Sequence, residues 1–310
     1  MGADDNHPMS NPYPPNGALP LTHWGLIRAR GPDAVKFLQS QLTNDVAAIG
    51  AADVRLAGFC SAKGRLQASF VIWKLADDEL LLACSASVLP ATLKRLSMFV
   101  LRAQCKLSDA SAELPLYGVV GDEAHALIGD TAVWTQGAVE GGTRVRLPDV
   151  AGAMRCMVAA SAAPVATALD LDTWRALEVR SGIPIIEAAT VDQFVPQMLN
   201  YEIVGGVDFR KGCYPGQEIV ARSQYRGTIK RRMFLFECDA PLAAGQEIFH
   251  SGDAAQPAGM VVNAAGRLAL VEVKLAALDA GTLHAGSATG PLLSRRELPY
   301  SVRNDTELPA

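Results

Sequence analysis

Short apolar runs separated by polar turns dominate the first third of the chain and predict strands that pair in sequence. Three β-rich runs follow one another, joined by turn-forming pairs at 63–64 and at 77–78, which is typical of an antiparallel meander. A helix is expected before the meander and another after it, because apolar residues recur there at helical spacing. The expected strands are 54–62, 64–75, 79–86 and 105–109, and the expected helices are 30–46 and 89–104.

The same arrangement recurs in a looser form after the first helix-flanked meander. Strands are expected at 114–121, 143–149 and 153–160, and helices at 122–129 and 171–182. An Ala-rich segment at 159–170 reads as a connector. The chain therefore predicts two α+β units of similar makeup, one after the other.

The pattern changes again from Ile229 onward. Short strands then alternate with Gly, Pro and Asp turns at near-regular intervals, as in a small β-barrel or sandwich. The expected fold class is α+β with a C-terminal β domain. The expected organisation is a flexible polar tail at 1–20, a two-module region at 21–232 and a β-barrel at 233–310.

Composition and charge narrow the function classes. The chain has 310 residues, with 28 basic against 32 acidic residues and a net charge of −4, so no global field attracts nucleic acid or an anionic membrane. No apolar run reaches the length that a bilayer requires. The N-terminal stretch lacks the features of signal and transit peptides, so a soluble protein of the cytoplasm is expected.

The six cysteines show no paired ligand spacing such as CxxC, so no metal site is predicted. In a reducing compartment these thiols stay free. Most of them are expected to be small buried hydrophobes. They are Cys60, Cys84, Cys105, Cys156, Cys213 and Cys238.

Cys213 differs from the other cysteines because of the stretch DFRKGCYPGQEIVAR at 208–222. A helix is expected to begin at about Gly216, and its free amide groups would point back towards Cys213. Those amides, together with Arg210 and Lys211, favour the thiolate over the thiol. Cys213 is therefore the candidate reactive cysteine, and a buried structural thiol is the alternative.

The same region reverses the charge of the chain locally. Seven basic residues occur within 23 positions that hold one acid, Glu218, so the segment is a candidate site for a carboxylate, a phosphate, a polyglutamyl tail or a nucleic-acid backbone. A solvated arginine face is the alternative reading. The seven are Arg210, Lys211, Arg222, Arg226, Lys230, Arg231 and Arg232.

Two further features are candidates for ligand contact. Lys63, Gly64 and Arg65 form a charged hairpin turn, for which an ordinary exposed turn is the alternative. Trp24 precedes the first strand of the meander, where it could stack on a planar ligand or cap the core.

The octapeptide KGCYPGQE at 211–218 resembles the signature of the YgfZ family of folate-binding proteins. That family is related to the glycine-cleavage T-protein and supports iron–sulfur cluster assembly. Further blocks resemble the family in the same order, and the resemblance runs from about Leu21 to Arg232. These blocks are 31–46, 60–70, 181–186, 193–222 and 225–232.

The resemblance implies two α+β modules and a small β-barrel around a central hole that accepts tetrahydrofolate or a one-carbon derivative. Glu178 falls where T-protein relatives use a carboxylate against the pterin ring. The implied catalytic residues are Cys213 and Lys211. The implied folate contacts are Trp24, Arg65, Glu178, Tyr214, Gln217, Glu218 and Arg222, and the implied shaping residues are Lys63, Gly64, Gly212 and Gly216.

The function expected from this resemblance is a folate-binding accessory factor that helps to assemble or repair iron–sulfur clusters in client enzymes. Its expected partners are the folate and iron–sulfur client or assembly proteins, with no membrane. Cys213 would transiently take sulfur, iron or a cluster fragment.

One departure from the T-protein bears on the alternatives. T-protein relatives carry an acid leading into the strand equivalent to 66–73, whereas the turn here is Lys63-Gly64-Arg65. A cation does not stabilise a developing positive centre, so glycine cleavage is disfavoured and Arg65 suits an anion better. A folate-dependent one-carbon transferase or demethylase is the alternative from the enzyme class. A third reading is an RNA-modification factor, although direct contact with nucleic acid is not expected.

Overall fold

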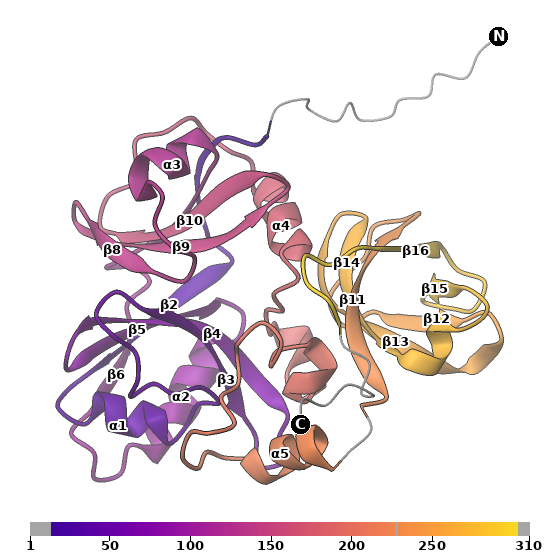
Figure 1. Ribbon diagram of the computed structural model, residues 1–310, viewed down its shortest axis with the longest axis horizontal. Coiled ribbons are helices and arrows are strands. Elements are labelled where there is room, and N and C mark those ends of the chain that lie inside the picture. The colour runs from indigo at the N-terminus through magenta and orange to yellow at the C-terminus, as the bar shows by residue number, and fades with distance from the viewer. Residues whose placement is uncertain (1–13, 227–228, 303–310) are drawn as a thin grey trace.

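The computed structural model describes residues 14–226 and 229–302, which form two five-stranded sheets and a closed barrel. Figure 1 shows the three units grouped around a common centre, with the two sheets stacked on one side and the barrel on the other. The α+β class and the C-terminal barrel are therefore confirmed. No helix among the described residues is long and apolar enough to cross a membrane.

The first sheet contains the expected antiparallel meander, because β3, β4 and β5 pair in sequence. Its faces are both buried: Phe70 and Ile72 face helices α1 and α2, whereas Val71 and Trp73 face the second sheet. This explains why β4 reads as a continuous apolar run. The sheet order is β3 (Val54–Cys60), β4 (Leu66–Ala76), β5 (Glu79–Ser85), β2 (Trp24–Arg30) and β6 (Lys106–Asp109), with α1 at Ala34–Gln39 and α2 at Leu89–Phe99.

Helix α1 is shorter than the pattern predicted, since it ends at Gln39. Beyond it the side chains of Thr43 and Asn44 bond to backbone: the Thr43 hydroxyl donates to the Gly206 carbonyl at 2.6 Å, and the Asn44 amide donates to the carbonyls of Leu56 at 2.6 Å and Gly205 at 2.7 Å. Such bonds compete with a helical backbone. The prediction of a helix to residue 46 was therefore wrong.

The second sheet includes one strand that comes before the first sheet in the chain. Its edge strand β1 (Gly17–Pro20) precedes the first sheet in the chain but pairs antiparallel with β7. Residues 17–20 of the segment expected to be a flexible tail are therefore part of a sheet, and residues 1–13 lie outside the described residues. The sheet order is β1, β7 (Leu116–Val120), β10 (Ala153–Ala160), β9 (Gly142–Val150) and β8 (Gln136–Val139), with α3 at Asp122–Ile128 and α4 at Leu171–Arg180.

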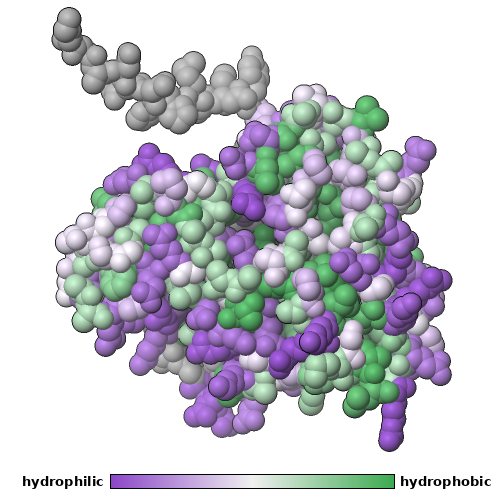
Figure 2. Space-filling model, turned by 180° about the vertical axis from the view of Figure 1, so that it is seen from behind, coloured by the Kyte–Doolittle hydropathy of each residue, from purple (hydrophilic) through white to green (hydrophobic). Residues whose placement is uncertain are grey.

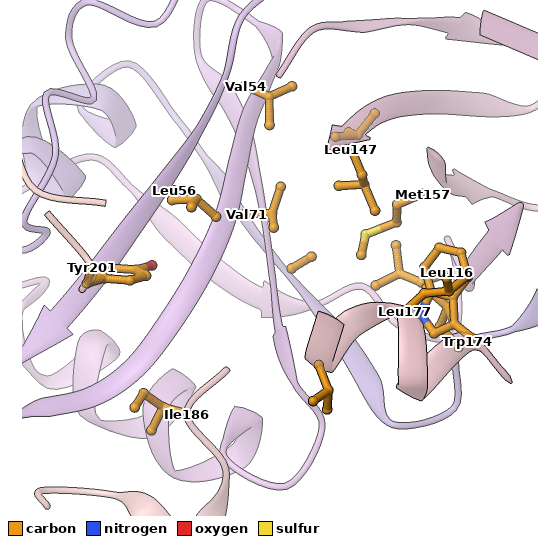
Figure 3. Packing of buried hydrophobic residues seen from close by; sticks show 14 of the residues in the cluster. Val54, Leu56, Val71, Leu116, Leu147, Met157, Trp174, Leu177, Ile186 and Tyr201 are labelled. Carbon is orange, nitrogen blue, oxygen red and sulfur yellow. The ribbon is translucent and has the colours of Figure 1, made fainter. Parts of the chain in front are cut away.

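A single apolar cluster joins the two sheets, α4 and the outer face of the barrel. Figure 3 shows Val54 and Val71 of the first sheet facing Leu147 and Met157 of the second, with Trp174 of α4 beside them. Because interiors are close-packed, this cluster sets the positions of the three units relative to one another.

The barrel begins at Arg231, two residues before the start expected at 233. Its strands close in the order β11 (Arg231–Cys238), β14 (Leu268–Lys274), β13 (Asp253–Ala265), β12 (Glu247–His250), β15 (Leu283–Ala285) and β16 (Leu292–Arg296). The Arg232 guanidinium donates to the Gln197 carbonyl at 2.9 Å and pairs with Glu202, so the first barrel strand is tied to the segment before the cysteine motif. Elsewhere hydrophobic and hydrophilic residues are interspersed over the outer surface, as Figure 2 shows for the rear face.

Candidate functional site

The cysteine motif forms an exposed loop that leads into helix α5 (Gln217–Tyr225). Gly216 occupies the N-cap with a φ of 78°, in the left-handed region that glycine adopts at little cost. The helix therefore begins where the sequence predicted.

Cys213 is the one exposed cysteine among the six, all of which lie in the described part of the chain. Burial raises the pKa of Cys60, Cys84 and Cys156 to about 12, so these thiols remain protonated near neutrality. Cys105 is half-buried and burial raises its pKa as well. The alternative of a buried structural thiol at Cys213 is therefore excluded by its exposure.

Lys211 anchors this loop from the inside. Its ammonium group donates to the carbonyls of Gln39 and Leu42, the latter at 2.6 Å, and lies 5.1 Å from the centre of the Tyr214 ring. Burial lowers the pKa of Lys211 to about 8. The nearby acidic groups of Asp45, Asp208 and Cys213 act in the opposite direction but do not offset the burial. A residue expected to act in catalysis is thus engaged with the end of α1.

The two glycine turns singled out in the sequence meet each other. A Cβ on Gly216 would lie 2.3 Å from the Ser61 carbonyl oxygen and 2.7 Å from the Gly64 Cα. A Cβ on Gly64, whose φ is 69°, would lie 2.9 Å from the Cβ of Ile219 in α5. The hairpin turn at 61–64 and the start of α5 therefore approach at backbone contact, which side chains at either position would prevent.

The remaining motif residues divide by exposure. Tyr214 is buried, and its burial raises the pKa of the phenol. Gln217 is half-buried, whereas Gly212, Glu218, Arg222 and Lys63 are exposed. Glu218 and Arg222 are accordingly available to a ligand on the surface of α5.

Arg65 is bonded to the backbone at 192–193. Its Nη1 donates to the carbonyls of Gln193 and of Asp192, the latter at 3.3 Å. It lines a separate pocket between the first sheet and the barrel.

Glu178 and Trp24 form a cluster of their own around α4. Oε1 of Glu178 accepts from the indole N–H groups of Trp24 at 2.6 Å and Trp174 at 2.7 Å, and Oε2 lies 2.9 Å from His23 Nε2. The hollow beside Glu178 has a volume of about 20 Å³, room for about one water molecule. In this arrangement the carboxylate joins α4 to β2, and α4 and α5 lie at different levels of the molecule in Figure 1.

Sequence reasoning missed a cleft of about 540 Å³ between the two modules, within the size range of small-molecule sites. Trp134, Phe209 and Tyr225 provide its aromatic surface, and the rings of Phe209 and Tyr225 meet edge to face at 5.7 Å. Its polar lining is Asn44, Arg55, Asp208 and Arg210. We call this space the aromatic cleft.

Phe209 and Tyr225 lie within the blocks 193–222 and 225–232 that resemble the family, and this was the one signal in the sequence that could have pointed to the cleft. Trp134 comes from the second module and carried no signal. Arg210 lies three residues before Cys213 in the chain, so their Cα atoms are at most about 11 Å apart. Cys213 itself does not line the cleft, but it is close in the chain to Arg210, which does.

The basic stretch serves two purposes. Lys211, Arg231 and Arg232 bond to groups of their own chain, whereas Arg210, Arg222, Arg226 and Lys230 are exposed. Part of the run is thus structural and part is a cationic surface. Across residues 14–226 and 229–302, no group of three or more His, Cys, Asp or Glu side chains is placed to hold a metal ion.

Gly216→Ala should destabilise the protein, because alanine resists a positive φ and its Cβ would overlap the Ser61 carbonyl. The expected loss is more than about 1 kcal/mol in the free energy of unfolding, measured by denaturant titration. Gly212→Ala is the matched control, because a Cβ there would meet nothing within 4 Å. Equal stability of the two variants would contradict the turn contact.

Lys211 predicts a pH dependence. Folded Lys211 loses its proton near pH 8, and unfolded Lys211 near 10.5. Between these values the unfolded chain binds more protons, so stability rises with pH in that window, and below it the cost of the buried charge is fully present. Relative to Lys211→Met, the wild type should gain up to about 3 kcal/mol across the window.

Unfolding titrations on both proteins at several pH values measure this gain. Lys230→Met, at an exposed lysine, should track the wild type. A constant difference between wild type and Lys211→Met would show that the ammonium is not desolvated.

Comparisons with known proteins agree with this architecture. The family model described as the GCVT N-terminal domain matches residues 17–159. The solved aminomethyltransferase T of the glycine cleavage system from Bartonella henselae superposes with a TM-score of 0.71 at 16% identity, covering 92% of this chain and 86% of that one. The likeness establishes a T-protein-like fold.

Curated relatives match almost end to end. The tRNA-modifying protein YgfZ of Serratia proteamaculans (strain 568) is 31% identical over 327 residues, covering 95% of this chain and 98% of the relative. The protein of the same name from Edwardsiella ictaluri (strain 93-146) is 32% identical over 340 residues, covering 96% and 98%. Identity at this level over nearly the full length shows that the chain belongs to the YgfZ family.

Proposed function

We propose that the protein is a tetrahydrofolate-binding accessory factor that helps to assemble or repair iron–sulfur clusters in client enzymes of the cytoplasm. The observation that carries the proposal is the single exposed thiol, Cys213, three residues along the chain from Arg210, which lines a cleft of ligand size. In this proposal the Cys213 thiol loses its proton, and the thiolate either binds iron or a cluster fragment as a ligand or attacks the outer sulfur of a persulfide donor, whose own thiolate leaves.

The chemistry of the aromatic cleft supports a folate as its ligand. A folate combines a flat pterin, a benzoyl ring and a glutamyl end with carboxylates. Aromatic side chains such as Trp134 and Phe209 suit the rings, and guanidinium groups such as Arg55 and Arg210 suit the carboxylates. Asp208 and Asn44 offer groups that could bond to the polar edge of the pterin.

The exposed part of the motif extends this site. Glu218 and Arg222 lie on the open surface of α5, and Tyr225 of the same helix lines the cleft. A ligand in the cleft would therefore lie against the helix whose first turn follows Cys213. Occupancy by folate could then alter the access of a client to the thiol.

The relatives suggest what one client does. They are named tRNA-modifying proteins, and a cluster-dependent enzyme that modifies tRNA would connect that name with cluster maintenance. In this proposal the accessory factor itself does not read tRNA.

Cys213→Ser should leave the fold and tetrahydrofolate binding intact and abolish client maturation, because a hydroxyl is neither a soft ligand for iron nor, unlike a thiolate, a nucleophile towards sulfane sulfur. The measurement is the modified-nucleoside content of tRNA in cells that contain only the variant, together with the melting temperature of the purified protein. Cys105→Ser is the matched control and should support maturation. Full rescue by Cys213→Ser would reject the thiol role.

Tyr225→Ala should weaken tetrahydrofolate binding about tenfold, which is the loss of about one aromatic contact. Tyr225 is 64% exposed, so its removal should hardly change stability. Calorimetric titration measures the affinity, and Phe99→Ala, at another exposed aromatic, should bind as the wild type does. Unchanged affinity in Tyr225→Ala would remove the folate from this cleft, and steady turnover of folate with an amine would favour the transferase alternative.

A further inference from the structure

A second hollow lies where the barrel meets the first sheet and the segment at 193–198. Its volume is about 450 Å³, again within the range of ligand sites, which favour domain interfaces. It shares no lining residue with the aromatic cleft. We call it the interface pocket.

Positive charge dominates the lining of the interface pocket. Arg65, Arg231 and Lys274 line it against one carboxylate, Glu272. Glu272 is buried, and Arg231 neutralises it through two contacts, with Nη2 3.0 Å from Oε2. Two positive charges therefore remain in excess, and low-dielectric walls strengthen their field.

The two arginines are held in place before any ligand arrives. Arg65 is fixed through Nη1 by the carbonyls of Asp192 and Gln193, and a guanidinium has further N–H donors on Nε and Nη2. Arg231 is fixed by Glu272, and Lys274 lies opposite Arg231 on the neighbouring strand. Fixed donors lose little entropy on binding.

The wall between these cations is apolar. Phe194, Met198, Pro257 and Met260 contribute to it, and thioethers adapt to ligands of different shape. A bare inorganic ion would leave this wall unused. The lining therefore combines a site for an oxyanion with a site for a hydrophobic or aromatic body.

We propose that the interface pocket binds an organic oxyanion, a phosphate or carboxylate group carried on an apolar body. The group would accept hydrogen bonds from Arg65 and Lys274, and the body would lie against Met198 and Met260. This site is distinct from the proposed folate site. Its ligand would be the anion that the sequence led us to expect at Arg65. A ligand here would bridge the barrel and the first sheet.

The test is calorimetric titration of the full chain with two probes, phenyl phosphate and phthalate, which distinguish a phosphate from a carboxylate source. Inorganic phosphate serves as the bare anion. At least one aromatic probe should bind at 1:1 and at least about tenfold more tightly than inorganic phosphate. If neither aromatic probe binds better than the bare ion, the proposal is overturned.

Two variants locate the binding. Lys274→Gln removes a charge, and Gln256→Glu adds an opposing charge at an exposed lining position; each should weaken the better probe at least about tenfold. Lys74→Gln is the matched control. It removes the same charge near the end of β4 that is far from Arg65, at a residue that does not line the pocket, so it should not change the affinity. Melting temperatures verify that all three fold.

Equal probe affinity in Lys274→Gln and the wild type would refute the site. Saturation with tetrahydrofolate should leave probe binding unchanged, because the two spaces share no lining residue. Displacement of the probe by tetrahydrofolate would show one shared site and overturn the inference. Loss of folate binding in Tyr225→Ala with retained probe binding would separate the two proposals.

Discussion

A buried ammonium group holds the loop that presents the reactive-cysteine candidate. Lys211 reaches across to the carbonyls at the end of α1, and charged hydrogen bonds of this kind are stronger than neutral ones. The cost is desolvation, visible in the lowered pKa of Lys211. With the loop anchored on its inner side, Cys213 two residues later stays at the surface. The exposure of that thiol therefore depends on a lysine that is itself hidden.

The second constraint on the site is the absence of side chains at two turns. Gly64 and Gly216 bring a hairpin of the first sheet into backbone contact with the start of α5. This contact aims the helix along the surface, so that Tyr225 closes one side of the aromatic cleft. The barrel is attached through Arg232, which bonds to Gln197 and Glu202. The basic stretch at 210–232 thus contains residues that bond to groups of their own chain and residues that form an exposed cationic surface.

Two hollows with different chemistry result from this assembly. The aromatic cleft lies between the two modules, and the interface pocket lies between the first sheet and the barrel. Arg65 was expected beside a folate, yet its guanidinium is directed to the second of these spaces. Glu178, also expected beside the pterin, is surrounded by ring N–H groups of Trp24 and Trp174 and by His23. The proposed folate site thus rests on the aromatic cleft, and the proposed oxyanion site on the interface pocket.

The sequence by itself determined the meander, the barrel and the start of α5, because each depends on periodicity, turn residues and caps within a few positions of one another. It also singled out Cys213, whose setting is local. The family blocks extended this to the T-protein-like fold. Only the tertiary structure decided the contact of Gly64 with Gly216, the pairing of β1 with the second sheet, and the cleft that Trp134 shares with Phe209. These features join segments far apart in the chain, and packing between distant surfaces leaves no period in the sequence from which it could be inferred.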